Sequence, residues 1–86
     1  MSDDVLADAR EVIRAEVEAR GDRVCIDALR EAFPAAHPGL HARLEAHYRD
    51  RRGYSWKTYV ARYARTVVDG MGFVGYDDVT HTFIMR

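Results

Sequence analysis

Three cations and a hydroxyl recur at a helical spacing in the second half of the chain: Lys57, Thr58, Arg62 and Arg65. Because an α-helix turns once every 3.6 residues, this spacing predicts one helical side that presents all four. A helix about 10–12 Å across fits the DNA major groove, where arginine can hold guanine through two hydrogen bonds. The stretch therefore predicts contact with a polyanion.

More arginines precede this stretch, and they would flank a groove that holds the helix. Such side chains bind phosphates, which supply affinity without sequence information. The residues that we expect to contact DNA are Arg49, Arg51, Arg52, Tyr54, Ser55, Lys57, Thr58, Arg62 and Arg65.

The net charge of −1 conceals an uneven distribution. Residues 1–36 carry five Lys/Arg against nine Asp/Glu, whereas residues 37–66 carry seven against two. Such asymmetry is typical of a chain with one side that faces a polyanion. The alternative interpretation is that each helix has a solvated charged face, and that these arginines pair with the acidic first helix.

Apolar periodicity predicts a first helix from Asp3 to Arg20, capped by Ser2 or Asp3 and ended by Gly21. Its acidic outer face is unsuited to DNA. A short strand over 23–25 and a two-turn helix over 26–33 follow.

Pro34 should close that second helix, because the residue before a proline is pushed out of the helical region. A third helix should run from Pro38 to about Arg52, where its arginines complement the helix dipole and Gly53 stops it.

The fourth helix should span residues 55–70, with Ser55 as its cap. Two strands, over 73–76 and 79–85, should then flank a tight turn at Asp77-Asp78. Because a lone hairpin is only marginally stable, we expect the strand over 23–25 to complete the sheet.

The segments Ser55-Trp56-Lys57-Thr58-Tyr59-Val60-Ala61-Arg62-Tyr63 and Val68-Asp69-Gly70-Met71-Gly72-Phe73-Val74 combine a capped basic helix, a glycine and an apolar pair, and the chain closes on Thr82-Phe83-Ile84-Met85-Arg86. In this order they resemble the recognition helix and wing of the winged-helix-turn-helix fold. The resemblance implies one winged-helix-like domain over 1–86, mostly α with a small β-sheet: four helices, a C-terminal hairpin wing and a short third strand. It makes the fourth helix the recognition helix and Arg51-Arg52-Gly53-Tyr54 the turn before it. The helix over 38–52 exceeds the simplest three-helix plan.

Aromatic residues gather in the second half of the chain, interleaved with arginines, and such residues can stack on single-stranded bases. We favour a core role for most of them, because Trp56, Tyr59 and Tyr63 share the apolar stripe of the fourth helix. Tyr54 and Tyr76 are expected to be exposed.

The sequence contains little evidence for a metal site or a catalytic site. His37 and His41 have the spacing of a zinc-binding pair, but their third ligand, His47 or Cys25, would have to come from elsewhere. His81 alternates with apolar neighbours, which favours a half-buried position. Without a phosphate loop, a nucleophile elbow or a desolvated carboxylate pair, we expect neither an enzyme nor a cofactor.

The sequence thus favours a cytoplasmic protein without a membrane segment that binds double-stranded DNA as a sequence-reading or architectural protein, such as a small transcriptional regulator. The acidic first helix would serve a homodimer or a protein partner. The alternative is a protein-interaction module of the same fold, whose basic helix docks on an acidic partner. The acidic turn and the near-neutral isoelectric point favour that alternative.

Overall fold

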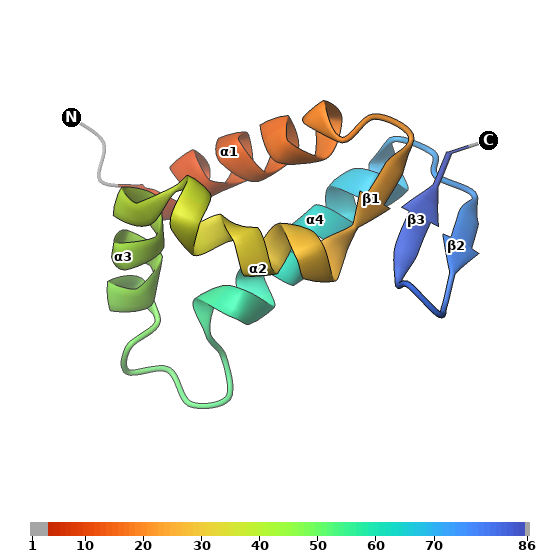
Figure 1. Cartoon of the computed structure of the whole chain (residues 1–86). Coiled ribbons are helices and arrows are strands. Elements are labelled where there is room, and N and C mark those ends of the chain that lie inside the picture. The colour runs from red at the N-terminus through yellow and green to blue at the C-terminus, as the bar shows by residue number, and fades with distance from the viewer. Residues whose placement is uncertain (1–3, 86) are drawn as a thin grey trace.

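The computed structural model describes residues 4–85. Along the chain these form α1 (Val5–Ala19), β1 (Arg23–Cys25), α2 (Ile26–Ala36), α3 (Pro38–His47), α4 (Trp56–Gly70), β2 (Gly75–Asp77) and β3 (Thr82–Ile84). Figure 1 shows the hairpin at one end of the molecule and α3 at the other, with α1, α2 and α4 between them. The expected mostly helical chain with a small sheet is confirmed. None of the described helices has the length and apolar character needed to cross a membrane.

Asp4 is the N-cap of α1, and its carboxylate accepts a hydrogen bond from the Ala7 amide at 3.0 Å. Ser2 and Asp3, which we expected as caps, lie outside the described residues. Every fourth residue from Val5 to Val17 is buried, and α1 packs on α4 and α3 through this stripe. Gly21 follows the helix with φ +72°, in the left-handed region. The acidic outer face is exposed, as expected.

The prediction that Pro34 closes the second helix is wrong, because α2 continues to Ala36. Proline removes one backbone hydrogen bond from a helix. Packing outweighs that loss here: Leu29 and Phe33 are each 1% exposed, and the Phe33 ring stacks on Trp56 with centroids 5.9 Å apart. The amide of His37 then closes the helix on the Phe33 carbonyl at 2.8 Å.

The third helix ends at His47, five residues before the expected Arg52. Tyr48 leaves the helix and packs its ring against Tyr54 at 5.1 Å and Tyr59 at 6.0 Å. Burying this ring, which is 9% exposed, directs the chain away from the helix axis. Arg49, Arg51 and Arg52 therefore lie in the loop between α3 and α4, and not at a helix end.

Residues of α4 form the centre of the core. Val60, Ala64 and Val68 are fully buried and Trp56 is nearly so, which confirms Trp56 as a core residue. Ser55 occupies the N-cap position, although its side chain makes no capping hydrogen bond. The helix ends at Gly70, and Gly72 follows with φ +82°.

The three strands are antiparallel in the order β1-β3-β2, which confirms the expected third strand. The position of the turn was predicted wrongly: Asp77 belongs to β2, and the chain reverses over residues 78–81. The Asp77 carboxylate accepts hydrogen bonds from the amides of Val79 (2.9 Å) and Thr80 (3.3 Å), and His81 has φ +53°. These contacts build a longer turn than the expected Asp77-Asp78 reversal.

Replacing Trp56 tests this account of the core. Trp56→Ala leaves a cavity beside Phe33, so we expect the free energy of unfolding to fall by about 3–5 kcal/mol in urea denaturation. Val79→Ala, at a position 86% exposed, should change it by less than about 0.5 kcal/mol. Equal stability of Trp56→Ala and the unmodified protein would contradict a core position.

Candidate functional site

The buried stripe of α4 determines which side chains the helix presents to solvent. Trp56, Val60 and Val68 face α1 and α2, so Arg62 and Arg65 point outward and Thr58 is half-buried. Lys57 is exposed as well, but it lies on another side of the helix, beside Trp56. The three cations of the expected set are therefore divided between two places, and Thr58 lines neither of them.

The first place is a groove between α4 and the hairpin, with a volume of about 460 Å³. Its basic wall is Arg62 and Arg65, and its apolar residues include Ala61 and Phe83. The start of α2 and the hairpin contribute the remaining residues: Ile26, Asp27, Tyr76 and His81, with Thr66 from α4.

The two arginines of this groove differ in their partners. The Arg65 Nε atom lies 3.2 Å from a carboxylate oxygen of Asp69, and its guanidinium lies 4.8 Å from the centre of the Phe83 ring. Both members of the Arg65–Asp69 pair are 59% exposed, so solvent screens it. Arg62 is exposed and forms no ion pair with any residue between 4 and 85. Both side chains are thus accessible to an external anion.

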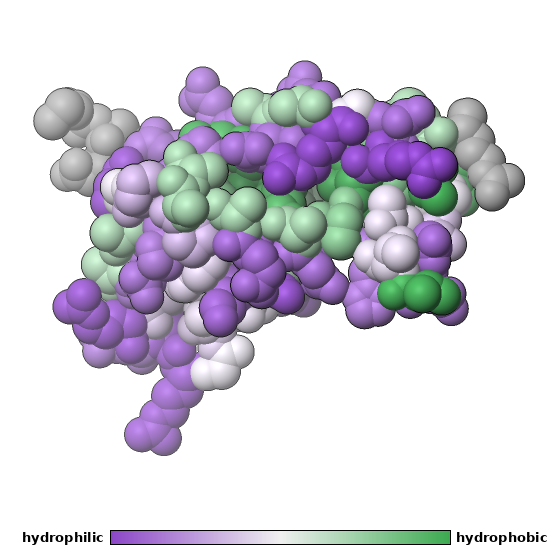
Figure 2. All heavy atoms as spheres, viewed as in Figure 1, coloured by the Kyte–Doolittle hydropathy of each residue, from purple (hydrophilic) through white to green (hydrophobic). Residues whose placement is uncertain are grey.

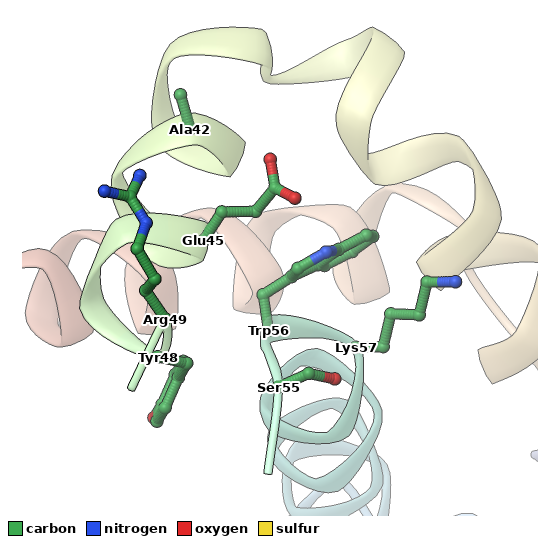
Figure 3. A pocket seen from close by; sticks show the side chains of 7 residues that line it. All are labelled: Ala42, Glu45, Tyr48, Arg49, Ser55, Trp56 and Lys57. Atoms are coloured by element: carbon green, nitrogen blue, oxygen red, sulfur yellow. The ribbon is translucent and has the colours of Figure 1, made fainter. Parts of the chain in front are cut away.

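The second place is a hollow of about 610 Å³ between the end of α3 and the start of α4 (Figure 3). Arg49 and Lys57 lie on opposite sides of it in this view, with Glu45 and Trp56 between them. The His41 Nε2 atom lies 3.4 Å from a carboxylate oxygen of Glu45. The start of α4 adds the positive end of a helix dipole to these two cations.

Loop residues extend the positive surface away from α4. Arg49, Arg51 and Arg52 are all exposed, and the guanidinium of Arg51 lies 5.8 Å from the centre of the Tyr48 ring. Burial raises the pKa of the Tyr48 hydroxyl, which keeps the ring neutral beneath this cation. Tyr54, which we expected to be exposed, is half-buried against Tyr48.

Tyrosine rings continue from this loop along α4. Tyr48 approaches Tyr59, and Tyr59 stacks on Tyr63 with centroids 6.3 Å apart. Arg14 of α1 donates a hydrogen bond to the Tyr63 hydroxyl at 3.2 Å. These rings join α1 to α4, which favours the core role over stacking on bases.

Residues 49–69 hold six Lys/Arg and two Asp/Glu. Five of these cations, Arg49, Arg51, Arg52, Lys57 and Arg62, form no ion pair within residues 4–85. The carboxylates of α1 bind elsewhere: Asp8 pairs with Arg43 at 2.9 Å, and Glu16 pairs with Arg20 and His37. The interpretation that the basic segment is neutralised by the first helix is therefore wrong for these residues.

Two contacts join the hairpin turn to the end of β1 and the start of α2. His81 Nδ1 lies 2.8 Å from an Asp27 carboxylate oxygen, and Cys25 Sγ donates to the Thr80 carbonyl at 3.3 Å. The hydrogen bond from His81 lowers the pKa of Asp27. The His81 side chain is 58% exposed, not half-buried as expected.

No family model, curated protein or solved structure matches this chain. Within residues 4–85, no three His, Cys, Asp or Glu side chains are grouped so that they could hold a metal ion. Any functional proposal for the chain therefore depends on its own geometry and charge.

Asp27, Tyr76 and His81 line the groove, although no local pattern in the sequence predicted this. The pairing of β1 with β3 brings them together, because its register sets Cys25 opposite Thr82. The expected third strand could have predicted this proximity, because any antiparallel pairing of residues 23–25 with the hairpin brings the start of the second helix near the turn.

Replacing Asp69 tests whether Arg65 is available to external anions. An exposed i,i+4 pair contributes only about 0.3–0.5 kcal/mol, so we expect Asp69→Asn to change the free energy of unfolding by no more than that. Urea denaturation at neutral pH measures it. A loss above about 1.5 kcal/mol would mean that the pair is part of the fold and that Arg65 is not available.

Proposed function

We propose that this chain is a winged-helix-like domain that binds double-stranded DNA, with the exposed side of α4 in the major groove. In this role Arg62 and Arg65 face base edges, and Arg49, Arg51, Arg52 and Lys57 hold phosphates beside the groove. Tyr54 and Ser55 position the turn before α4. The chain would then be a small sequence-reading or architectural DNA-binding protein, such as a transcriptional regulator.

The observation that carries the proposal is the set of cations without a carboxylate partner. Holding like charges together on a small domain has a free-energy cost unless a counter-charge is supplied. A duplex supplies one phosphate charge about every 1.7 Å of helix axis. The basic residues of the α3–α4 loop and Lys57 and Arg62 of α4 have no carboxylate partner within residues 4–85, whereas Arg20, Arg30 and Arg43 each have one. Arg65 pairs only with the exposed Asp69, so it too is accessible for that counter-charge.

The order of elements supports the same proposal. Along the chain, β1 follows α1, and α4 directly precedes the hairpin of β2 and β3. In the sheet, β1 pairs with β3 as the third strand. This is the arrangement that the winged-helix resemblance implies, with α3 as an addition.

A second candidate function is docking of a protein on the hairpin. Figure 2 shows a strongly hydrophobic spot at the tip of the hairpin. Val79, in the turn, is 86% exposed, and two more large apolar residues are exposed along the hairpin: Val74 before β2 (75%) and Tyr76 within it (52%). Neighbouring apolar residues at a surface are typical of a protein interface.

Charge reversal on α4 separates these candidates. Arg62→Glu with Arg65→Glu should lower the affinity for a duplex by at least about 100-fold, because each base or phosphate contact contributes about 1–3 kcal/mol. Fluorescence anisotropy at fixed salt measures the affinity, and circular dichroism verifies that the variant is folded.

A matched control carries the same change in net charge outside this surface. Arg23→Glu with Arg43→Glu replaces two exposed arginines on β1 and α3, and it should retain the duplex affinity to within a few-fold. Equal affinities of the two double variants would contradict the assignment of α4 to the major groove. A Val74→Ser and Val79→Ser variant that loses a protein partner while the α4 variant keeps it would favour docking on the hairpin.

A further inference from the structure

His81 is the only residue between Met71 and Met85 that can carry a positive charge. The hairpin otherwise holds Asp77 and Asp78, which a phosphate would repel. The Asp77 carboxylate is engaged by the Val79 and Thr80 amides, and these hydrogen bonds lower its pKa. Any attraction between the hairpin and a phosphate therefore depends on His81.

The contact with Asp27 determines which nitrogen of His81 carries a hydrogen. The Asp27 carboxylate is ionised at neutral pH, since its pKa is lowered, so it can only accept a hydrogen bond. His81 Nδ1 must then donate across the 2.8 Å contact. In the neutral ring the other nitrogen, Nε2, is left with a lone pair, which repels an anion. Protonation places a hydrogen and a positive charge at Nε2.

The position of the ring suits a phosphate. His81 lines the same groove as Arg62 and Arg65, and Nε2 has no hydrogen-bond partner within residues 4–85. More than half of the side chain is exposed, so a ligand can approach it. We propose that His81 is the phosphate-binding residue of the hairpin and that it binds only when protonated, so that duplex binding takes up one proton. This proposal rests on the proposed DNA-binding function.

Several other charged or titratable groups surround His81, and they determine how its proton responds to a duplex. Asp27 is shared with Arg30, whose Nη2 atom lies 3.4 Å from the second carboxylate oxygen. The remaining groups near the turn and the groove are Arg23, Arg62, Arg65, Tyr76, Asp77, Asp78 and Cys25. The charge of the protonated ring attracts a phosphate that is bound at Nε2. Binding and protonation therefore favour each other.

The test is duplex affinity as a function of pH at constant salt, between about pH 5.5 and 8, where histidine changes its charge. A phosphodiester does not titrate in this range, so the protein accounts for any dependence. Affinity should rise toward low pH by up to about tenfold per pH unit, the limit for uptake of one proton. His81→Asn should bind without this dependence, and asparagine suits the left-handed backbone at this position. His81→Lys should bind with high affinity at every pH, because its charge is permanent.

Control variants at other histidines identify the source of the proton. His41→Gln and His47→Gln lie on α3, away from the groove, and should retain the pH dependence. A pH-independent affinity of the unmodified protein, or an unchanged dependence in His81→Asn, would overturn this inference and leave the DNA-binding proposal standing. Absence of duplex binding at every pH would overturn both.

A measurement on the free protein tests the geometric basis by itself. The ¹⁵N chemical shifts of the neutral His81 ring should identify Nδ1 as the protonated nitrogen. A neutral ring protonated at Nε2 would contradict the role given to Asp27.

Discussion

The arrangement of this domain depends on the burial of one face of α4. Val60, Ala64 and Val68 are excluded from solvent against α1 and α2, and this packing sets the rotation of the helix about its axis. Turning the helix by one residue would bring an arginine toward the core, where an unpaired charge costs several kcal/mol. The apolar stripe therefore determines that Arg62 and Arg65 point outward.

Burial of a second group, the ring of Tyr48, determines the shape of the basic surface. The ring leaves α3 to pack against Tyr54 and Tyr59, so the chain beyond it forms an exposed loop. The arginines of this loop then lie in irregular backbone beside the start of α4. Both parts of the surface are thus placed by apolar and aromatic packing.

Much of this architecture follows from local patterns in the sequence. The 3.6-residue periodicity of α1 and α4 and the β-branched run near the C-terminus predicted four helices, a hairpin and a third strand. Two boundaries failed for the same reason. Pro34 favours an end to the second helix, and Arg49 to Arg52 favour an end to the third. The burial of Phe33 and Tyr48 determines where the two helices end instead, because tertiary packing outweighs local preference.

The candidate site was less predictable, because half of it is made by pairing between distant segments. Arg62 and Arg65 share a helix and were found by spacing. Asp27 and His81 lie 54 residues apart and meet only because β1 pairs with β3. Lys57 and Arg62 line different places on the surface because of the side of α4 that is buried. Their spacing in the sequence predicted that they share one side of the helix, and it did not predict this division.

The most direct test of the central claim, that the unpaired cations form a surface for a duplex, is the salt dependence of binding. Fluorescence anisotropy with a random duplex of about 30 base pairs gives the affinity at several salt concentrations. If the four phosphate-binding cations contact the duplex, and on a random sequence Arg62 and Arg65 also rest on phosphates, log K should fall against log salt with a slope of about −3.5 to −5.5. No binding at about 50 mM salt would contradict the account, because every DNA-binding surface of this charge has that non-specific term.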